Sequence, residues 1–160
     1  MDPRCYQPRI LACIQALREF SACFVFINKN NYQQPSEAVK RLILCSGKVF
    51  YDLIEKKKEE NREDIAVIRI EQLYPFPYDD LEEILTKYQN VQEFIWCQEE
   101  PLNQGAWFSH RHRIQRVLDR LGDGLEVSLV SRPAAAAPAV GLMKLHLQQQ
   151  KDLVNEAICK

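Results

Sequence analysis

Short apolar runs alternate with helical patterns along most of the chain, beginning near residue 38. Apolar runs at residues 42–45, 65–70, 91–97 and 125–130 each end at polar or turn residues. Runs of this length, bounded by turn residues, are typical of strands that are covered on both faces of a sheet. The pattern therefore predicts four strands.

Between and after these strands, apolar residues recur at three- and four-residue spacing. This spacing predicts helices over residues 49–60, 79–87, 105–121 and 140–158. Strand and helix alternate four times, which is typical of βαβ units with right-handed crossovers. We expect an α/β fold with a mostly parallel sheet and helices on its faces.

A change in composition divides the chain into two parts. Residues 28–36 are almost entirely polar, and they separate a first part rich in Cys, Asn and Gln from the regular pattern that follows. Such a polar stretch is typical of a linker. We expect an N-terminal segment and linker over residues 1–37 and one domain over residues 38–160.

The charge and cysteine content exclude several classes of protein. The chain has 160 residues and a formal net charge of −1, so it lacks the excess of basic residues that is typical of nucleic-acid-binding domains. Its six cysteines form no CxxC pair and are too sparse for a disulfide scaffold, so we expect a reducing compartment. No apolar stretch approaches the length of a membrane span, and the N-terminus lacks a signal-peptide core.

A phosphate-binding loop is the first candidate site. Ser46-Gly47-Lys48 follows a predicted strand and begins a helix, where phosphates often bind. A Walker loop also needs Gly at position 42 and Ser or Thr at position 49. Leu42 and Val49 occupy these positions, so the sequence predicts only a tight turn.

The histidines and cysteines do not predict a metal or catalytic site. His110 and His112 are two residues apart on one predicted helix and face different directions, and His146 is distant in sequence. Cys45 and Cys97 end apolar strands, which favours buried structural thiols over nucleophiles.

Gln98, Glu99 and Glu100 follow the third strand, at the edge of the sheet where α/β proteins bind ligands. Paired carboxylates can act as an acid and a base, but neighbouring side chains diverge and no nucleophile lies nearby in the sequence. We therefore expect a structural or interface role for these three residues and no catalytic residue.

Two helix faces are candidate contact surfaces. Arg113, Arg116 and Arg120 form one stripe, which is either a solvated face or a contact with an acidic surface of another domain or subunit. The last helix has an apolar side that either packs on the sheet or forms a dimer or interdomain surface. That side comprises Met143, Leu147, Val154 and Ile158.

Four long strings resemble, in order and spacing, the C-terminal domain of the 2-oxoglutarate dehydrogenase family. The similar component of this family is the decarboxylating one, which depends on thiamine diphosphate. The resemblance covers about residues 38–158. The strings are Val39–Lys48, Ile68–Pro77, Trp96–Trp107 and Arg132–Gly141. The bacterial form is the more similar one, notably around Leu145-His146 and residues 149–155.

The resemblance implies a transketolase C-terminal-like fold, with three layers and a mostly parallel sheet of four to five strands flanked by helices. The complete family enzyme decarboxylates 2-oxoglutarate on thiamine diphosphate and Mg²⁺ in the citric acid cycle, and passes the succinyl group to a lipoyl-bearing succinyltransferase. It works as a homodimer. We expect a cytoplasmic bacterial location, or alternatively the mitochondrial matrix.

The resemblance transfers no catalytic, cofactor or metal residue, because the domains that hold the cofactor are not in this chain. Gly122-Asp123-Gly124 mimics the start of the Mg²⁺ motif but is expected to be a turn. Expected partners are the remaining domains of the same component, a second copy, and the succinyltransferase, with no nucleic acid or membrane. The candidate interface residues are Gln98, Glu99, Glu100, Arg113, Arg116, Arg120 and Arg132.

Three functional alternatives remain at this point. The chain is a C-terminal domain or fragment that works only with the other domains of the enzyme, a stand-alone interaction or regulatory module, or part of the 2-oxoadipate-specific relative. Ser131 stands where many family members have Gly. Ala135 and Ala137 stand where many bacterial members have Ser, which argues against a hydroxyl role there.

Overall fold

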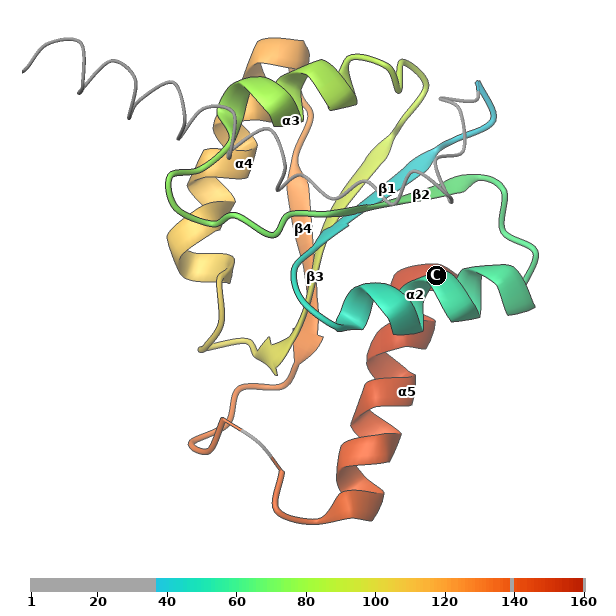
Figure 1. The fold of residues 1–160 in the computed structure, drawn as a ribbon, viewed down its shortest axis with the longest axis vertical. Helices are drawn as coiled ribbons and strands as arrows, with labels where there is room; N and C mark the ends of the chain where they lie inside the picture. The colour runs from blue at the N-terminus through green and yellow to red at the C-terminus, as the bar shows by residue number, and fades with distance from the viewer. Residues whose placement is uncertain (1–36, 139, 160) are drawn as a thin grey trace, which may run out of the picture.

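Four parallel strands form the centre of the computed structural model, which describes residues 37–138 and 140–159 (Figure 1). The strands are β1 (Arg41–Cys45), β2 (Ile65–Arg69), β3 (Glu93–Pro101) and β4 (Val127–Arg132). Their order across the sheet is β2-β1-β3-β4, and each neighbouring pair is parallel. The predicted α/β fold with a parallel sheet is confirmed.

Two pairs of helices cover the two faces of this sheet and complete the three layers (Figure 1). The helices are α2 (Val49–Glu59), α3 (Tyr78–Leu85), α4 (Trp107–Leu121) and α5 (Met143–Cys159). Helices α2 and α5 pack on one face, and α3 and α4 pack on the other.

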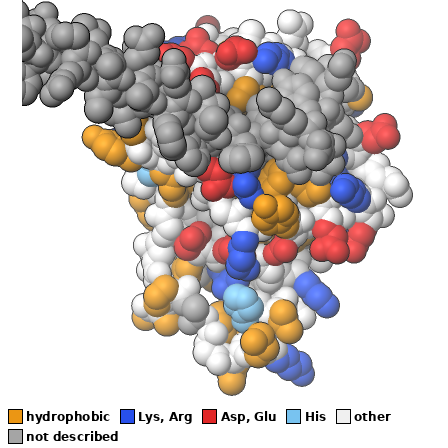
Figure 2. Space-filling model, viewed as in Figure 1, with side chains coloured by type: hydrophobic (Ala, Val, Ile, Leu, Met, Phe, Trp, Pro, Cys, Tyr) orange, Lys and Arg blue, Asp and Glu red, His pale blue; other side chains and the backbone are white. Residues whose placement is uncertain are grey.

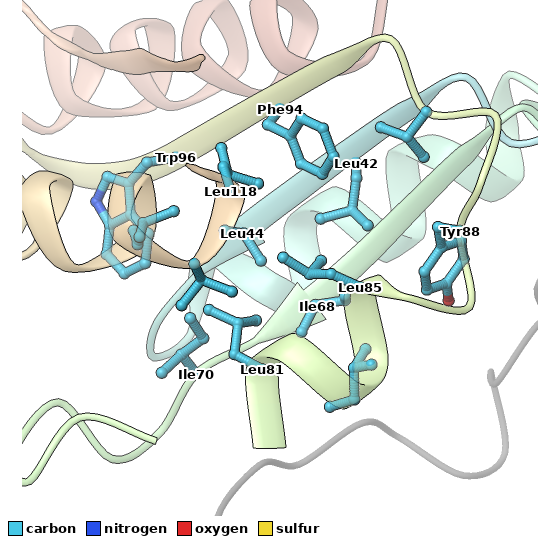
Figure 3. Packing of buried hydrophobic residues seen from close by; sticks show 14 of the residues in the cluster. Leu42, Leu44, Ile68, Ile70, Leu81, Leu85, Tyr88, Phe94, Trp96 and Leu118 are labelled. Atoms are coloured by element: carbon cyan, nitrogen blue, oxygen red, sulfur yellow. The ribbon is translucent and has the colours of Figure 1, made fainter. Parts of the chain in front are cut away.

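The continuous apolar run of β1 is explained by burial on both faces. Leu42 and Leu44 belong to the core beneath α3 and α4, and Ile43 and Cys45 belong to the core beneath α2 and α5. All five residues of the strand are buried. Figure 3 shows the first core, where side chains of β1 and β3 meet Leu81 and Leu118 from the helices.

The connections leave neighbouring strands toward opposite faces of the sheet. The chain leaves β1 for α2 on one face and leaves the adjacent β3 for α4 on the other. Such a switch in direction opens a crevice beyond the carboxyl ends of the strands, where α/β proteins bind ligands. We call this region the carboxyl edge, and define it as the strand-to-helix loops 46–48, 70–77, 102–106 and 133–142 with the first turns of the helices that follow.

The largest boundary difference is in β3, which extends four residues beyond the predicted run of 91–97. After a register shift between Cys97 and Pro101, the strand pairs again with β4 through Pro101 and Arg132. The polar residues 98–100 therefore belong to the strand. The third predicted helix begins at Trp107, because Gly105 has a φ of +71° and forms the turn before it.

Helix α5 differs from its prediction in what it buries. Its second half packs on the sheet through Val154 and Ile158, but Met143 is 71% exposed and Leu147 is 54% exposed. The first half of the helix extends past the ends of the strands, where no sheet lies against it (Figure 1). The predicted segment over residues 1–37 lies outside the described residues, except for its last residue.

Candidate functional site

Gln150, in the middle of α5, joins three other elements at the carboxyl edge. Its Nε2 donates hydrogen bonds to Asp52 Oδ2 of α2 at 2.7 Å and to Glu99 Oε1 of β3 at 2.9 Å. Its Oε1 accepts a hydrogen bond from Arg132 at the end of β4, at 2.8 Å. The side chain thereby holds α5 against both the sheet and α2. Gln150 carries no local sequence signal for this role, because its partners are distant in sequence.

Lys48 adds an ion pair at the switch point between β1 and β3. Its Nζ lies 2.7 Å from Glu99 Oε1, and this hydrogen bond raises the pKa of Lys48 above its ordinary value. The Lys48 side chain is largely exposed, so the pair contributes only about 0.2–1 kcal/mol. The predicted turn at Gly47 is present, with a φ of +70°.

The charges of this network compensate one another. Lys48 and Arg132 offset Asp52 and Glu99, and both carboxylates accept a hydrogen bond from Gln150. The network is therefore suited to fixing the positions of β3, β4, α2 and α5.

Gln98, one of the candidate interface residues, is buried within the domain. Its Oε1 accepts hydrogen bonds from Trp96 Nε1 at 3.1 Å and from the Trp107 backbone N–H at 3.0 Å. Its Nε2 donates to the Gln104 carbonyl at 2.8 Å. The side chain is 2% exposed, because it folds back beneath the turn at Gly105, where an added Cβ would lie 2.9 Å from Glu100 Cβ.

Arg132 is likewise buried, at 6% exposure, and it contacts Gln150 rather than the surface. Of the candidate residues near the end of β3, Glu99 is half-buried within the network and Glu100 is exposed. A contact of this region with a second protein stays a prediction. Such a contact would involve the exposed part of the carboxyl edge.

The arginine stripe of α4 contacts α3 of the same domain. Arg113 donates to the Tyr78 hydroxyl at 3.3 Å, and the Arg116 guanidinium lies 5.7 Å from the centre of the Tyr78 ring. Arg120 pairs with Glu82 at 2.8 Å. The stripe is therefore not simply a solvated face, because α3 packs beside α4. Its contact with an acidic surface of another protein stays a prediction.

His110 and His112 lie on α4, which contributes no residue to the network, whereas His146 lies one turn before Gln150 on α5. The His110 ring links α4 to the loop after β2, with Nε2 2.9 Å from the Leu73 carbonyl and Nδ1 2.7 Å from Ser109 Oγ. His112 is exposed, and His146 lies on α5. Among the described residues, no group of three His, Cys, Asp or Glu side chains is arranged to hold a metal ion.

Cys45 is buried at the end of β1, and Cys97 is buried in the middle of β3. Burial, with a smaller contribution from the nearby Glu99 carboxylate, raises the pKa of Cys97 to about 12; burial also raises the pKa of Cys45. Because each pKa lies well above neutral pH, both side chains are held as neutral thiols. This state is unsuited to a nucleophile.

We expect Cys45 and Cys97 to resist iodoacetamide in the folded chain at about pH 8, whereas the exposed Cys159 reacts. Peptide mass mapping after timed labelling measures the modified fraction at each site. In denaturant, all three should be labelled. Labelling of Cys97 as fast as Cys159 in the folded chain would contradict a buried, protonated thiol.

Within the described ranges, none of the helices has the length and apolar character needed to cross a membrane.

Comparison with known proteins identifies relatives over most of the chain. The family model described as "2-oxoglutarate dehydrogenase C-terminal" matches residues 15–158. The 2-oxoglutarate dehydrogenase E1 component of Haemophilus influenzae is 49% identical over 120 residues, which cover 75% of this chain and 12% of the relative. The E1 component of Azotobacter vinelandii is 50% identical over 119 residues, covering 74% and 13%.

A mitochondrial 2-oxoglutarate dehydrogenase of Schizosaccharomyces pombe is 40% identical over 124 residues, covering 78% of this chain and 12% of the relative. A solved structure titled "Split gene transketolase, inactive beta4 tetramer" aligns with a TM-score of 0.48 at 15% identity, over 75% of this chain and 39% of that one. The chain thus spans about an eighth of the length of the curated relatives. On the match over residues 15–158, the chain belongs to the 2-oxoglutarate dehydrogenase C-terminal family.

Proposed function

We propose that this chain serves as the C-terminal domain of a 2-oxoglutarate dehydrogenase E1 component and that its role there is structural. The family match over residues 15–158 carries this proposal. The compensated network around Gln150 supports the structural role, because it holds α5 against β3, β4 and α2. The oxidative decarboxylation of 2-oxoglutarate and succinyl transfer to a lipoyl group then depend on the rest of the component.

The described residues do not fit the thiamine diphosphate and Mg²⁺ of the family enzyme. Such a site needs several oxygen ligands in a near-octahedral array around the metal. Asp123 of the Gly-Asp-Gly string is exposed in the turn between α4 and β4, at the opposite end of the sheet from the carboxyl edge. No further carboxylate, cysteine or histidine joins it in a metal-binding group within the described residues.

We expect the purified chain alone to show no saturable binding of thiamine diphosphate in the presence of Mg²⁺. The physical reason is that a lone exposed carboxylate cannot replace the several ligands that the diphosphate-bound metal requires. Isothermal titration calorimetry measures the binding. A saturable isotherm for the chain by itself would contradict the structural role proposed here.

Co-expression tests the proposed function directly. The full 160-residue chain is produced together with the Haemophilus influenzae E1 component from which the aligned C-terminal segment has been removed. We expect the chain to restore 2-oxoglutarate decarboxylation, measured with an artificial electron acceptor, to a truncated protein that is inactive alone. Absence of both complex and activity would overturn the proposal and favour a stand-alone module. The same assay with 2-oxoadipate distinguishes the related enzyme.

We propose that the stable unit of this chain begins near residue 38. Val39 is 1% exposed and lies in the core beneath α3 and α4, so cleavage beyond it requires the domain to open. Limited proteolysis followed by intact mass measurement should give a protected fragment that begins shortly before Val39. A protected fragment beginning before residue 20 would contradict this boundary.

The expected location is the bacterial cytoplasm, as for a component of central metabolism. The partners we propose are the remaining domains of the E1 component, a second copy of it, and the lipoyl-bearing succinyltransferase. The bacterial names among the relatives support the cytoplasmic location, and the mitochondrial name of the Schizosaccharomyces pombe relative supports the alternative. Cell fractionation of the native organism, followed by immunoblotting, tests this.

A further inference from the structure

The large apolar side chains that remain exposed in the described part of the chain all lie at one end of the sheet. Each of them is in a strand-to-helix loop of the carboxyl edge or in the first turns of the helix that follows. The opposite loops, at residues 60–64, 86–92 and 122–126, contribute none. The exposed residues are Tyr51, Tyr74, Leu102, Phe108, Leu142, Met143, Leu145 and Leu147.

The densest part of this set is at the beginning of α5. Leu142 and Met143 are 70% and 71% exposed, Leu147 lies one turn beyond Met143 on the same face of α5, and Leu145 is exposed on the opposite face of the helix. Figure 2 shows hydrophobic side chains at the lower end of the molecule, over the part of α5 that extends beyond the sheet. Single exposed apolar residues are ordinary, but a contiguous group marks a surface that another protein covers.

The loops of this edge are held in place by polar contacts. Asn103 exchanges two hydrogen bonds of 3.0 Å with the backbone of Ala135, and Gln104 donates a third to the same carbonyl. These contacts tie the loop that carries Leu102 to the loop that leads into Leu142. Together with the network around Gln150, they give a preorganised surface, which lowers the entropy lost on docking.

We propose that the carboxyl edge is the surface on which the remaining, upstream part of an E1 polypeptide docks. This inference rests on the proposed function. The aligned segment is 12% of the Haemophilus influenzae relative, so more than four fifths of that polypeptide lies outside it and is available as the occupant. In the relatives, the C-terminal segment and the upstream part belong to one polypeptide. Because they are covalently linked, each part has a high effective concentration for the other.

The test replaces Leu142 and Met143 with aspartate in the full-length chain. Leu142 accepts the first helical hydrogen bond of α5, from His146, and aspartate is favoured at such a helix start. The variant should therefore fold. The control pair is Gln89→Asp with Gln92→Asp, which adds the same charge at exposed positions in the loop before β3. Circular dichroism and melting temperature check the folding of both variants.

Each tagged chain is co-expressed with the truncated Haemophilus influenzae E1 component, and the amount of truncated protein retained per tagged chain is measured. We expect the Leu142→Asp/Met143→Asp variant to retain at least tenfold less than the parent, and the control pair to match the parent. Equal retention by both variants would overturn the carboxyl edge as the docking surface while leaving the proposed function intact. Failure of the parent chain itself to retain the truncated protein would overturn the proposed function.

Sedimentation velocity of the isolated chain provides the second measurement. A weak self-association that the Leu142→Asp/Met143→Asp variant abolishes is expected for an uncovered docking surface. A stable parent dimer that the same variant dissociates, and that the truncated E1 component does not displace, would overturn the proposal and assign this edge to a second copy.

Discussion

Ile68→Asp is expected to lower the free energy of unfolding by about 4 kcal/mol or more, a large share of the roughly 5–15 kcal/mol of an ordinary domain. Ile68 is 1% exposed in β2 and lies in the core beneath α3 and α4 (Figure 3). An aspartate there would place a carboxylate among apolar side chains. Urea unfolding monitored by circular dichroism measures the loss.

The sequence suggests a central strand for this residue, whereas β2 lies at the edge of the four described strands. Ile68 is nevertheless buried, because α3 covers its side of the sheet and contributes Leu81 and Leu85 to the same core. Ile68→Val is the matched control, since it removes one methyl group and should cost about 0.5–1.5 kcal/mol. A melting temperature of the aspartate variant within a couple of degrees of the parent would show that Ile68 is not buried.

Gln98→Leu is expected to cost about 3 kcal/mol although it replaces a polar side chain with an apolar one of similar size. Its Oε1 is the acceptor for two buried donors, Trp96 Nε1 and the Trp107 backbone N–H. Each buried donor left without a partner costs about 1–3 kcal/mol. Urea unfolding monitored by tryptophan fluorescence also reports on Trp96 and Trp107 directly.

Gln92→Leu is the control for this substitution, because Gln92 is exposed just before β3 and should change stability by less than about 0.5 kcal/mol. We also expect the Gln98→Leu variant to loosen the turn at Gly105, which Gln98 holds through the Gln104 carbonyl. Equal stability of the two leucine variants would show that the hydrogen bonds of Gln98 are replaced by other partners, and would contradict its structural role.

Local periodicity is sufficient to predict which segments are strands and which are helices. The five residues of β1 are apolar or amphipathic in succession, as suits a strand buried on both faces. Asp79 and Asp80 lie in the first turn of α3, where carboxylates stabilise a helix start. Boundaries that depend on a distant partner were missed. The end of β3 is one of these, since the pairing of Pro101 with Arg132 exists only once β4 is in place.

In the candidate site, too, the roles of side chains depend on partners that are distant in sequence. Gln98 is a candidate from its position after an apolar run, but its burial depends on the turn at Gly105 and on the start of α4, which fold over it. Gln150 carries no local signal at all, since it hydrogen-bonds to Asp52 across 98 residues. A regular polar pattern on a helix does not distinguish a solvated glutamine from one that joins four elements.

The sequence by itself determined the α/β fold, the alternation of its elements and the family, because each is encoded by short-range spacing or by long matching strings. The tertiary structure decided which apolar side chains remain uncovered. Val154 and Leu147 are seven residues, about two turns, apart and lie on the same face of α5, yet the first is buried and the second is exposed, because the helix is longer than the sheet it packs against. Helical periodicity places a side chain on a face of its own helix, and only the neighbouring strands determine how far along the helix that face is buried.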